Sequence, residues 1–400
     1  MKILFISMRL PHPRVGSGHM IVHQRIQRLA KRGHQVGLVV FEQEDDADHV
    51  PEIRDVLHEL EIVPRPRRAL GDRVNNFLFS RVPPRFAEYR SDEMRRRVGD
   101  MVERTPYDVV VAEFGLMGQY VHWNPYLPAV RKVISVHQCH TLAARKALET
   151  LGWSPIAFRE WFALQRLQRF ELDMYRSADR IVVLTAEARY SVLSYAPDLR
   201  VSMIPSGVDT DYYRPGDPAK REHALLFTGY YRDEPNRDAV LWFVHTVWPT
   251  LKAQFPELVF YVVGPEPTAA IRELAAKNSG IIVTGEVDDI RPYLNKARVF
   301  VCPNRIGSGM RGKILQAMAS GVPVVATSLG AEGIPIQMGD TGFLADKPEI
   351  LAQSIKMLLT DEVLHGGIAQ RARAMMVERF SWDQGVRQFE NILEEVVSGR

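Results

Sequence analysis

The residues that point most directly to chemistry form a glycine-rich loop at the start of a predicted helix. Residues 305–325 read as strand end, loop, helix, turn and strand. The loop contains Gly309, Met310, Arg311, Gly312 and Lys313. Free N–H groups at a helix N-terminus bind anions and two neighbouring cations add to that preference, so the segment predicts a diphosphate site. In the alternative interpretation the glycines are ordinary turn formers and Lys313 is solvated, which the clustering of loop, cations and helix start disfavours.

A second pair of cations, Arg232 and Arg237, follows the first predicted strand of the second half of the chain. Open parallel sheets bind ligands beyond the carboxyl ends of their strands, so both arginines are candidates for the same anion site. Adjacent opposite charges are also common on loops. The competing interpretation is therefore surface pairing with Asp233, Glu234 or Asp238.

Two features within the N-terminal half of the chain could contact the same ligand. Gly16 and Gly18 end the loop after the first predicted strand, where missing Cβ atoms would let a phosphate or sugar approach closely. His137 ends the apolar strand at 132–136, which is a suitable place for a ligand contact. His140 lies three residues further on, but no Cys/His/Asp set with zinc spacing accompanies the pair. We therefore expect no metal site.

Several enzyme classes lack their sequence signatures in this chain. No Gly-x-Gly-x-x-Gly follows the first strand directly, which disfavours a nicotinamide dehydrogenase. The chain also lacks a Gly-x-Ser-x-Gly elbow and a P-loop, which argues against an α/β hydrolase and a P-loop NTPase. No Asp-x-Asp stands at a strand end, where it would indicate a divalent cation.

The elements that must position these residues are continuous apolar strands alternating with helices, which indicates parallel sheets covered on both faces. The strands of the first half are expected at 2–7, 35–41, 108–113, 132–137 and 180–185, and those of the second half at 224–228, 259–264, 280–284, 299–303 and 322–326. A turn-rich stretch at 203–218 separates the two sets. We predict two Rossmann-like α/β/α domains that face each other across a cleft, spanning residues 1–203 and 204–377.

The last segment, residues 378–400, carries an apolar stripe at helical spacing. Its members include Phe380, Trp382, Val386, Phe389, Ile392 and Val396. Such a stripe usually packs against a core. We expect this C-terminal helix to cross back and pack on the first domain.

Composition restricts the location and the partners. The chain has 400 residues, 46% hydrophobic content, a formal net charge of +3 and two cysteines, Cys139 and Cys302. So few cysteines argue against a disulfide framework, and the mild charge argues against nucleic acid as a partner. No stretch of about twenty apolar residues and no signal peptide are recognisable, so we expect a cytoplasmic protein.

Residues 64–98 are rich in arginine interleaved with phenylalanine. This combination suits anionic lipid headgroups and predicts peripheral binding at the inner face of a membrane. In the alternative, the arginines belong to a solvated helical face and pair with Glu88, Asp92 and Glu93. The sequence favours neither interpretation over the other.

Two segments resemble the domain junction of a known family, the retaining glycosyltransferases of group 4 with the GT-B fold. Residues 179–185 read DRIVVLT and residues 204–215 read IPSGVDTDYYRP. The resemblance covers nearly the whole chain and is strongest from residue 179 to residue 382. It implies a hexosyltransferase-type enzyme that takes a UDP- or GDP-sugar as donor and a glycan or lipid-linked acceptor. It implies no cofactor, because the nucleotide sugar is a substrate.

The resemblance also implies roles for individual residues. The donor diphosphate would lie on the backbone of residues 309–312, with Arg237 and Lys313 as cationic partners. Gly18 would approach the distal phosphate and sugar. His137 would hydrogen-bond the sugar or the developing charge. The base would lie against Glu286 and Val287.

One motif of the family is altered here. The family usually carries a Glu-x7-Glu motif across the loop and helix, and the aligned positions are Ser308 and Gln316. Gln316 can still exchange hydrogen bonds with ribose hydroxyls. A subgroup of the family replaces the first glutamate with a Gly-Ser-Gly loop followed by Arg and Lys, which this sequence resembles.

The resemblance implies metal-independent sugar transfer with retention of configuration, and we expect this reaction to serve cell-surface polysaccharide or glycolipid synthesis. Preorganised donors at a developing negative charge are usually the largest catalytic contribution, which explains why cations and backbone amides matter more here than an obvious base. Two rivals remain open: a sugar-nucleotide epimerase of the same architecture and a non-catalytic nucleotide-sugar-binding protein.

Overall fold

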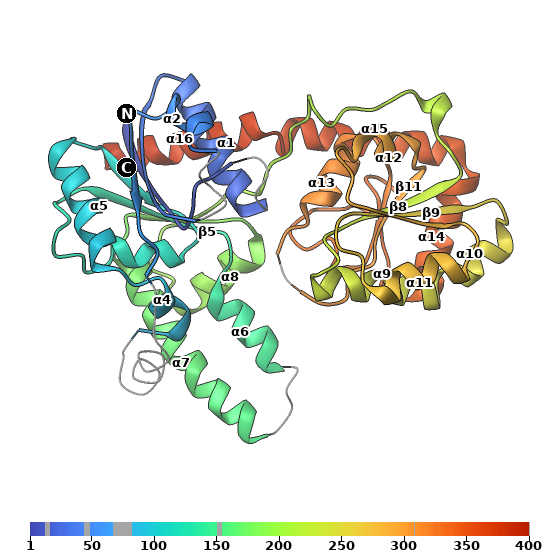
Figure 1. Ribbon diagram of the computed structural model, residues 1–400, viewed down its shortest axis with the longest axis horizontal. Helices are drawn as coiled ribbons and strands as arrows, with labels where there is room; N and C mark the ends of the chain where they lie inside the picture. The colour runs from blue at the N-terminus through green and yellow to red at the C-terminus, as the bar shows by residue number, and fades with distance from the viewer. Residues whose placement is uncertain (13–16, 44–48, 67–81, 150–153, 308, 400) are drawn as a thin grey trace. The chain divides into compact units, whose positions relative to one another are not determined.

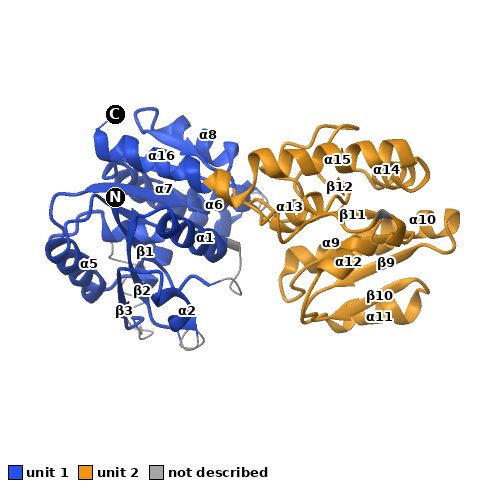
Figure 2. Cartoon of the chain, turned by 90° about the horizontal axis from the view of Figure 1, so that it is seen from above, with its two compact units in different colours: residues 1–205, 386–400 blue, residues 206–385 orange. Residues whose placement is uncertain are grey.

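A computed structural model describes residues 1–12, 17–43, 49–66, 82–149, 154–307 and 309–399. The chain forms two compact units (Figure 2). The first comprises Met1–Pro205 and Val386–Arg400, and the second comprises Ser206–Gly385. Each unit is an α/β structure built on its own sheet.

The described residues of the first unit form a seven-stranded parallel sheet in the order β3-β2-β1-β4-β5-β6-β7. Its strands are β1 (Lys2–Ser7), β2 (Gln35–Phe41), β3 (Glu59–Val63), β4 (Val109–Ala112), β5 (Arg131–Val136), β6 (Arg180–Val183) and β7 (Val201–Met203). Alternate residues of a strand point to opposite faces, so an apolar run covers both. Leu4 and Ile6 therefore join one core, whereas Ile3 and Phe5 join the other.

Helices cover both faces of this sheet (Figure 1). The helices are α1 (Ser17–Lys31), α2 (Val50–Arg54), α4 (Pro84–Glu88), α5 (Asp92–Arg104), the 3-10 helix η2 (Leu116–Tyr120), α6 (His140–Glu149), α7 (Pro155–Arg176), α8 (Ala186–Tyr195) and α16 (Trp382–Ser398). Residues of α1, α2 and α16 share one core with the sheet, and residues of α5, η2, α7 and α8 share the other. Ser91, Ser154 and Thr185 each accept a backbone N–H at the start of the following helix, which fixes where that helix begins.

The described residues of the second unit form a six-stranded parallel sheet in the order β10-β9-β8-β11-β12-β13. The strands are β8 (Ala224–Thr228), β9 (Val259–Val263), β10 (Ile281–Gly285), β11 (Val299–Cys302), β12 (Val324–Ala326) and β13 (Phe343–Leu344). The helices are η3 (Pro218–Lys220), α9 (Glu234–Thr246), α10 (Trp248–Gln254), α11 (Ala269–Lys277), α12 (Arg291–Lys296), α13 (Gly312–Ala319), α14 (Pro348–Thr360) and α15 (Glu362–Arg379). Two parallel-sheet α/β units confirm the predicted fold class.

The strand order defines where each unit can bind a ligand. In both sheets the chain reverses its direction of strand addition after three strands, between β1 and β4 in the first unit and between β8 and β11 in the second. In open α/β sheets, ligands bind beyond the carboxyl ends of the strands at this switch point. The loops that follow these four strands are therefore the places to look for a site.

The C-terminal helix α16 packs on the first unit from Val386 onward. The ring of Phe389 lies 6.4 Å from that of Phe5 on β1. Glu390 accepts hydrogen bonds of 2.6 Å from both Arg32 and His34 at the end of α1. These contacts attach the helix to the same face of the sheet that α1 covers.

None of the described helices is long and apolar enough to cross a membrane.

Candidate functional site

In the second unit, two helix N-termini meet at the switch point. Strands β8 and β11 pair in parallel, so their carboxyl ends lie at the same edge of the sheet. Helix α9 begins at Glu234 after β8, and α13 begins at Gly312 after β11. Asn304 joins the two loops, because its Nδ2 donates to the carbonyl of Pro235 at 2.9 Å. Free N–H groups from two helices can therefore face one ligand.

Lys313 connects the same two loops. Its Nζ donates to Oδ1 of Asn236 at 2.7 Å and lies 4.1 Å from the centre of the Phe227 ring. Burial lowers the pKa of Lys313 to about 8. A cation that is partly buried and held in the first turn of a helix is well suited to a phosphate oxygen.

The loop before Lys313 has the backbone conformation that only glycine adopts easily. Gly307 and Gly309 have φ angles of +94° and +90°. The N–H of Gly309 donates to Oε2 of Glu332 at 2.6 Å, and Nη1 of Arg311 donates to the carbonyl of Gly309. A Cβ on Gly312 would meet nothing within 4 Å. Ser308 lies outside the described residues.

Arg232 and Arg237 do not make the ion pairs that the competing interpretation named. Arg232 forms an ion pair with Glu266, with 2.6 Å between Nε and Oε2. Asp238 forms its ion pair with Arg305 instead. Nη1 of Arg237 donates to the carbonyl of Arg232 at 2.6 Å. Surface pairing thus does explain Arg232, although with a partner 34 residues away on the next loop rather than a neighbour in the sequence.

The remaining residues assigned to donor binding lie in the second unit, on α13 and in the loops after β10 and β11. Gln316 on α13 donates from Nε2 to the hydroxyl of Tyr213 at 3.1 Å, which leaves its Oε1 as the acceptor for another group. Met310 and Val287 pack against one hydrophobic cluster. Glu286 follows β10 directly and is exposed.

In the first unit, Gly18 of α1 and His137, which follows β5, come together beside Phe114 in the loop after β4. Gly18 lies in the first turn of α1, and a Cβ added there would lie 2.7 Å from the Phe114 ring and 3.1 Å from Nδ1 of His137. The Phe114 ring in turn lies between His19 and His137, with centroids 4.4 and 4.3 Å away. A larger residue at position 18 would therefore have to displace the Phe114 ring. Gly16 lies outside the described residues.

Sequence reasoning missed the buried charges beneath His137. Glu113 follows β4 and is fully buried, and its Oε2 lies 2.7 Å from Nε2 of His137. Burial by itself would raise the pKa of Glu113, but Arg25 and then His137 outweigh it and lower that pKa to about 2. Burial lowers the pKa of His137. An ionised carboxylate next to a neutral imidazole is the result.

Phe114 is a strained residue at the same place. Its φ is +68°, a conformation that bulky side chains rarely adopt, and Gly115 follows with φ +70°. Such strain persists only where the surroundings enforce it, and it gathers at functional sites. The strained turn directs the Phe114 ring against Gly18 and His137.

His140 is not part of this cluster. Its Nδ1 accepts from Arg85 at 3.4 Å, and burial lowers its pKa to about 4. Glu171 accepts the backbone N–H groups of His140 and Thr141 and so caps α6. The described residues contain no group of three or more potential metal ligands. That donor binding needs no metal stays a prediction.

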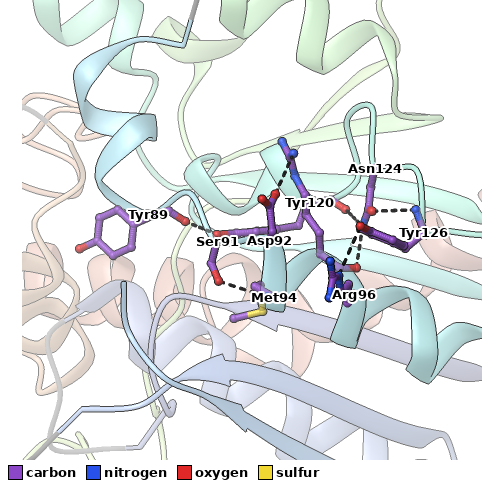
Figure 3. A network of polar contacts seen from close by, with 9 residues as sticks. Tyr89, Ser91, Asp92, Met94, Arg96, Tyr120, Asn124 and Tyr126 are labelled. Atoms are coloured by element: carbon purple, nitrogen blue, oxygen red, sulfur yellow. Dashed lines mark hydrogen bonds and ion pairs between the residues drawn. The ribbon is translucent and has the colours of Figure 1, made fainter. Parts of the chain in front are cut away.

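Many arginines of the basic segment 64–98 make local contacts. Arg95 pairs with Asp92, and Arg65 pairs with Glu88, each at 3.5 Å. Figure 3 shows the network at the start of α5, in which Arg96 also donates to the Tyr126 hydroxyl at 3.3 Å. Two of the acidic residues named by the solvated-face interpretation thus form ion pairs with arginines of this segment. Residues 67–81 lie outside the described residues.

Comparison with known proteins identifies the chain. Residues 19–212 match the model of Glycosyltransferase Family 4, and residues 222–361 match that of Glycosyl transferases group 1. A phosphatidyl-myo-inositol mannosyltransferase of Mycolicibacterium smegmatis is 30% identical over 48% of this chain and 51% of that enzyme. A D-inositol 3-phosphate glycosyltransferase of Corynebacterium aurimucosum is 23% identical over 100% of this chain and 97% of that enzyme.

A similar solved structure is that of Anabaena HepE in complex with UDP-glucose. Its TM-score is 0.68, with 15% identity over 99% of this chain and 100% of that one. The chain spans about half the length of the mannosyltransferase and nearly all of the inositol-phosphate enzyme and of HepE. The family resemblance seen in the sequence is therefore confirmed, and the chain belongs to the group 4 glycosyltransferases of the GT-B fold.

Proposed function

We propose that this enzyme transfers a hexose from a UDP- or GDP-sugar to a glycan or lipid-linked acceptor, with retention of configuration and without a metal ion. One observation carries the proposal. Lys313 is fixed by Asn236 where the N-termini of α9 and α13 meet, beside the glycines at 309 and 312. Backbone N–H groups and a partly buried ammonium together match the charge and size of a diphosphate.

The related proteins support this donor class. HepE was solved with UDP-glucose, and both relatives described above are named as enzymes that transfer sugars to inositol-containing acceptors. A lipid-linked or polyol acceptor, used in cell-surface polysaccharide or glycolipid synthesis, is the corresponding proposal for this chain.

In the proposed reaction the bond between the anomeric carbon and the diphosphate oxygen breaks, and a bond from that carbon to an acceptor oxygen forms on the same face. The acceptor hydroxyl loses its proton to the departing diphosphate. Lys313, Arg237 and the free N–H groups in the first turn of α13 stabilise the negative charge that develops on the leaving group. His137 contacts the sugar through a hydrogen bond and forms no covalent bond to it.

A product assay tests this function. Purified enzyme is incubated with UDP- and GDP-hexoses and a panel of acceptors that includes inositol phosphate, phosphatidylinositol and oligosaccharides, with and without EDTA. We expect acceptor-dependent release of nucleoside diphosphate that EDTA does not abolish. The anomeric coupling of the product in NMR spectra then shows whether configuration is retained.

The rival functions give different results in the same assay. A sugar-nucleotide epimerase would change the sugar without any acceptor. A non-catalytic binder would bind the nucleotide without turnover. Either result contradicts the transferase proposal, and neither is expected from a chain of this family.

We also propose that the enzyme works in the cytoplasm, at the inner face of an anionic membrane. Helix α7 supports this, because its first turns expose large apolar side chains. They are Ile156, Phe158, Trp161 and Phe162, with exposed fractions of 58%, 66%, 45% and 55%. Exposed aromatic side chains on a helix with neighbouring cations suit the boundary between headgroups and acyl chains.

The part of the basic segment from Val82 onward lies against the same helix. Phe86 of α4 contacts Phe170 of α7 with ring centroids 4.8 Å apart, and Arg166 donates to the carbonyl of Val82 at 3.0 Å. Figure 1 shows α6 and α7 as a pair that extends from the sheet of the first unit, with α4 next to α7. Apolar and basic groups therefore occur on adjoining elements of one unit.

Vesicle flotation tests the membrane proposal. We expect binding to vesicles that contain phosphatidylglycerol, weak binding to pure phosphatidylcholine, and loss of binding as salt is raised. The double variant Phe158→Ser, Trp161→Ser should reduce binding by at least tenfold. Val363→Ser on α15, which is 87% exposed, is the matched control. Equal binding by the double variant and the control would contradict the assignment of α7.

A further inference from the structure

A buried network of polar groups contacts His137, and no group of this network takes part in the reaction proposed above. Arg25 on α1 is 3% exposed and donates from Nη1 to both carboxylate oxygens of Glu113, at 2.8 and 3.1 Å. The same nitrogen lies 2.7 Å from the hydroxyl oxygen of Ser135 on β5. The network thus joins α1, β5 and the end of β4.

The arrangement determines which nitrogen of His137 carries the proton. Arginine can only donate and an ionised carboxylate can only accept, so Nε2 of His137 must donate to Glu113. Arg25 and Glu113 already balance each other's charge, and a protonated imidazole would add an uncompensated charge at a buried position. Among the described residues, the charges that act on the ring are those of Glu113 and Arg25. The neutral ring therefore keeps a lone pair on Nδ1.

The Nδ1 atom has no hydrogen-bond partner within the described part of the chain, although it is buried. It lies on the side of Gly18, where an added Cβ would be 3.1 Å away, and glycine leaves that position open. Leaving a buried acceptor unpaired is costly, so a bound group that donates a hydrogen bond to it would gain affinity.

We infer that Glu113, held by Arg25 and Ser135, is a positioning residue that keeps His137 in the Nε2–H form, so that Nδ1 beside Gly18 accepts a hydrogen bond from a hydroxyl of the donor sugar. A phosphate oxygen, which can only accept, is excluded from this position. The inference rests on the proposed function for the identity of the sugar, but the proton position on His137 is a property of the free protein.

The C-terminal helix completes the support. The guanidinium carbon of Arg25 lies 4.1 Å from the centre of the Phe389 ring on α16, and Phe389 is fully buried. A cation over an aromatic face is stabilised without needing another acceptor. Arg25 is thus fixed from the sheet side by Glu113 and Ser135 and from the helix side by Phe389.

NMR spectra of protein labelled with ¹⁵N-histidine test the proton position without any substrate. Wild type should show a protonated Nε2 and an unprotonated Nδ1 for His137 between pH 6 and 8, with the signals assigned from His137→Gln. In Glu113→Gln the amide oxygen is needed by Arg25, so the amide NH₂ faces the imidazole and donates to Nε2. We expect the proton to move to Nδ1 in this isosteric variant.

The kinetic consequence is tested with the same variant. Glu113→Gln should lower kcat/KM for sugar transfer by at least about tenfold, because Nδ1 becomes a donor, as wrong-tautomer variants of other histidine sites do. The Kd for free nucleoside diphosphate should stay within about twofold, because that site lies in the other unit. The matched control is Glu390→Gln, which alters a similar Arg32–Glu390–His34 group remote from His137 and should leave transfer unchanged.

The possible outcomes are distinct. A wild-type ring protonated at Nδ1, or no change of proton position in Glu113→Gln, would overturn the assignment of Glu113. A moved proton with unchanged kcat/KM would overturn the contact with the sugar hydroxyl. If wild type transfers no sugar at all, the proposed function fails, yet the spectra still decide the role of Glu113.

Discussion

The two units have the same order of central strands but opposite chemistry at their switch points. In the first unit, the charged groups next to the ends of β4 and β5 are buried and paired with each other. Their carboxylate also contacts a neutral histidine. In the second unit, a lysine, arginines and glycine amides surround the ends of β8 and β11, with exposed loops beside them. The first arrangement suits an uncharged polyhydroxyl group, and the second suits an anion.

This difference shows that the loops after the strands, and not the sheet, determine what each unit can bind. A nucleotide sugar has one end of each kind, an anionic diphosphate and a neutral sugar. The predictions below separate the contributions of the two units, because changes at the first should affect turnover and changes at the second should affect nucleotide affinity.

The largest expected effect is on turnover. His137→Ala removes the group that contacts the sugar, and we expect kcat to fall about 100-fold, as when a preorganised hydrogen-bonding group is lost from other sites. The Kd for free nucleoside diphosphate, measured by calorimetry, should change by less than about twofold. His245→Ala, at an exposed position on α9, is the control. Unchanged kcat would remove His137 from the site.

The next effect is on nucleotide affinity. Lys313→Ala removes a partly buried cation at two helix N-termini, and Kd for the nucleoside diphosphate should rise by about 10- to 100-fold. Arg237→Ala should give a smaller increase, because this guanidinium already donates to a backbone carbonyl. Lys356→Ala on the exposed side of α14 is the control. A Kd that is equal in Lys313→Ala and in the control would place the diphosphate elsewhere.

Affinity should also depend on pH. The pKa of Lys313 is lowered to about 8, so its ammonium is present below pH 8 and is lost above it. Calorimetry should therefore show Kd rising by about tenfold between pH 7 and pH 9, the slope expected when one proton is required for binding. Lys313→Arg stays charged throughout this range and should give a flat profile. A falling Kd would contradict the role of the ammonium.

An effect of similar size isolates the backbone contact. A Cβ on Gly312 meets nothing within 4 Å in the free protein, so Gly312→Ala should leave Tm nearly unchanged. It should weaken nucleoside diphosphate binding by about tenfold if phosphate approaches that amide closely. Gly366→Ala within α15, which also meets nothing within 4 Å, should stabilise the helix by roughly 0.5–1 kcal/mol without affecting binding. Identical affinity in both variants would argue against a phosphate at Gly312.

The smallest effect concerns the altered motif. Gln316→Glu restores the second carboxylate of the family motif, and the Tyr213 hydroxyl that now accepts from Gln316 can rotate to donate instead. We expect the affinity for a nucleoside diphosphate to increase by about two- to fivefold through a charged acceptor for ribose hydroxyls. A loss of affinity would show that the amide is the group the site requires.

The fold could be predicted from the sequence wherever a strand is buried on both faces. β1, β2, β4, β5, β6, β8, β9, β11 and β12 are such strands, and each appears as an apolar run. β10 lies at the edge of its sheet and is only partly buried, but its apolar run was still recognised. β3 was missed because Glu59 and Glu61 interrupt it, and these residues contact Arg104 at the edge of the sheet. β7 and β13 are only three and two residues long, too short for any periodic pattern.

The site could be predicted only in part. Strand ends and glycine loops located Lys313, His137 and Gly18, because those positions follow from topology. Glu113 was treated as the last residue of an apolar strand, and Arg25 as one residue of a helix. Neither residue was therefore considered for the site. A signal was present, since Arg25 lies three residues from Val22 and four from Leu29 on the buried face of α1. The positive φ of Phe114 has no signature in the sequence.

The most direct test of the whole account is a thermal-shift comparison of wild type with Lys313→Ala. Both proteins are screened against UDP, GDP, ADP, dTDP and their common sugar conjugates, with and without EDTA. We predict that one nucleoside diphosphate raises the Tm of wild type equally with and without EDTA, and that Lys313→Ala loses most of that shift. A wild type that responds to none of these ligands, or a variant that responds as strongly as wild type, would contradict the proposed donor site.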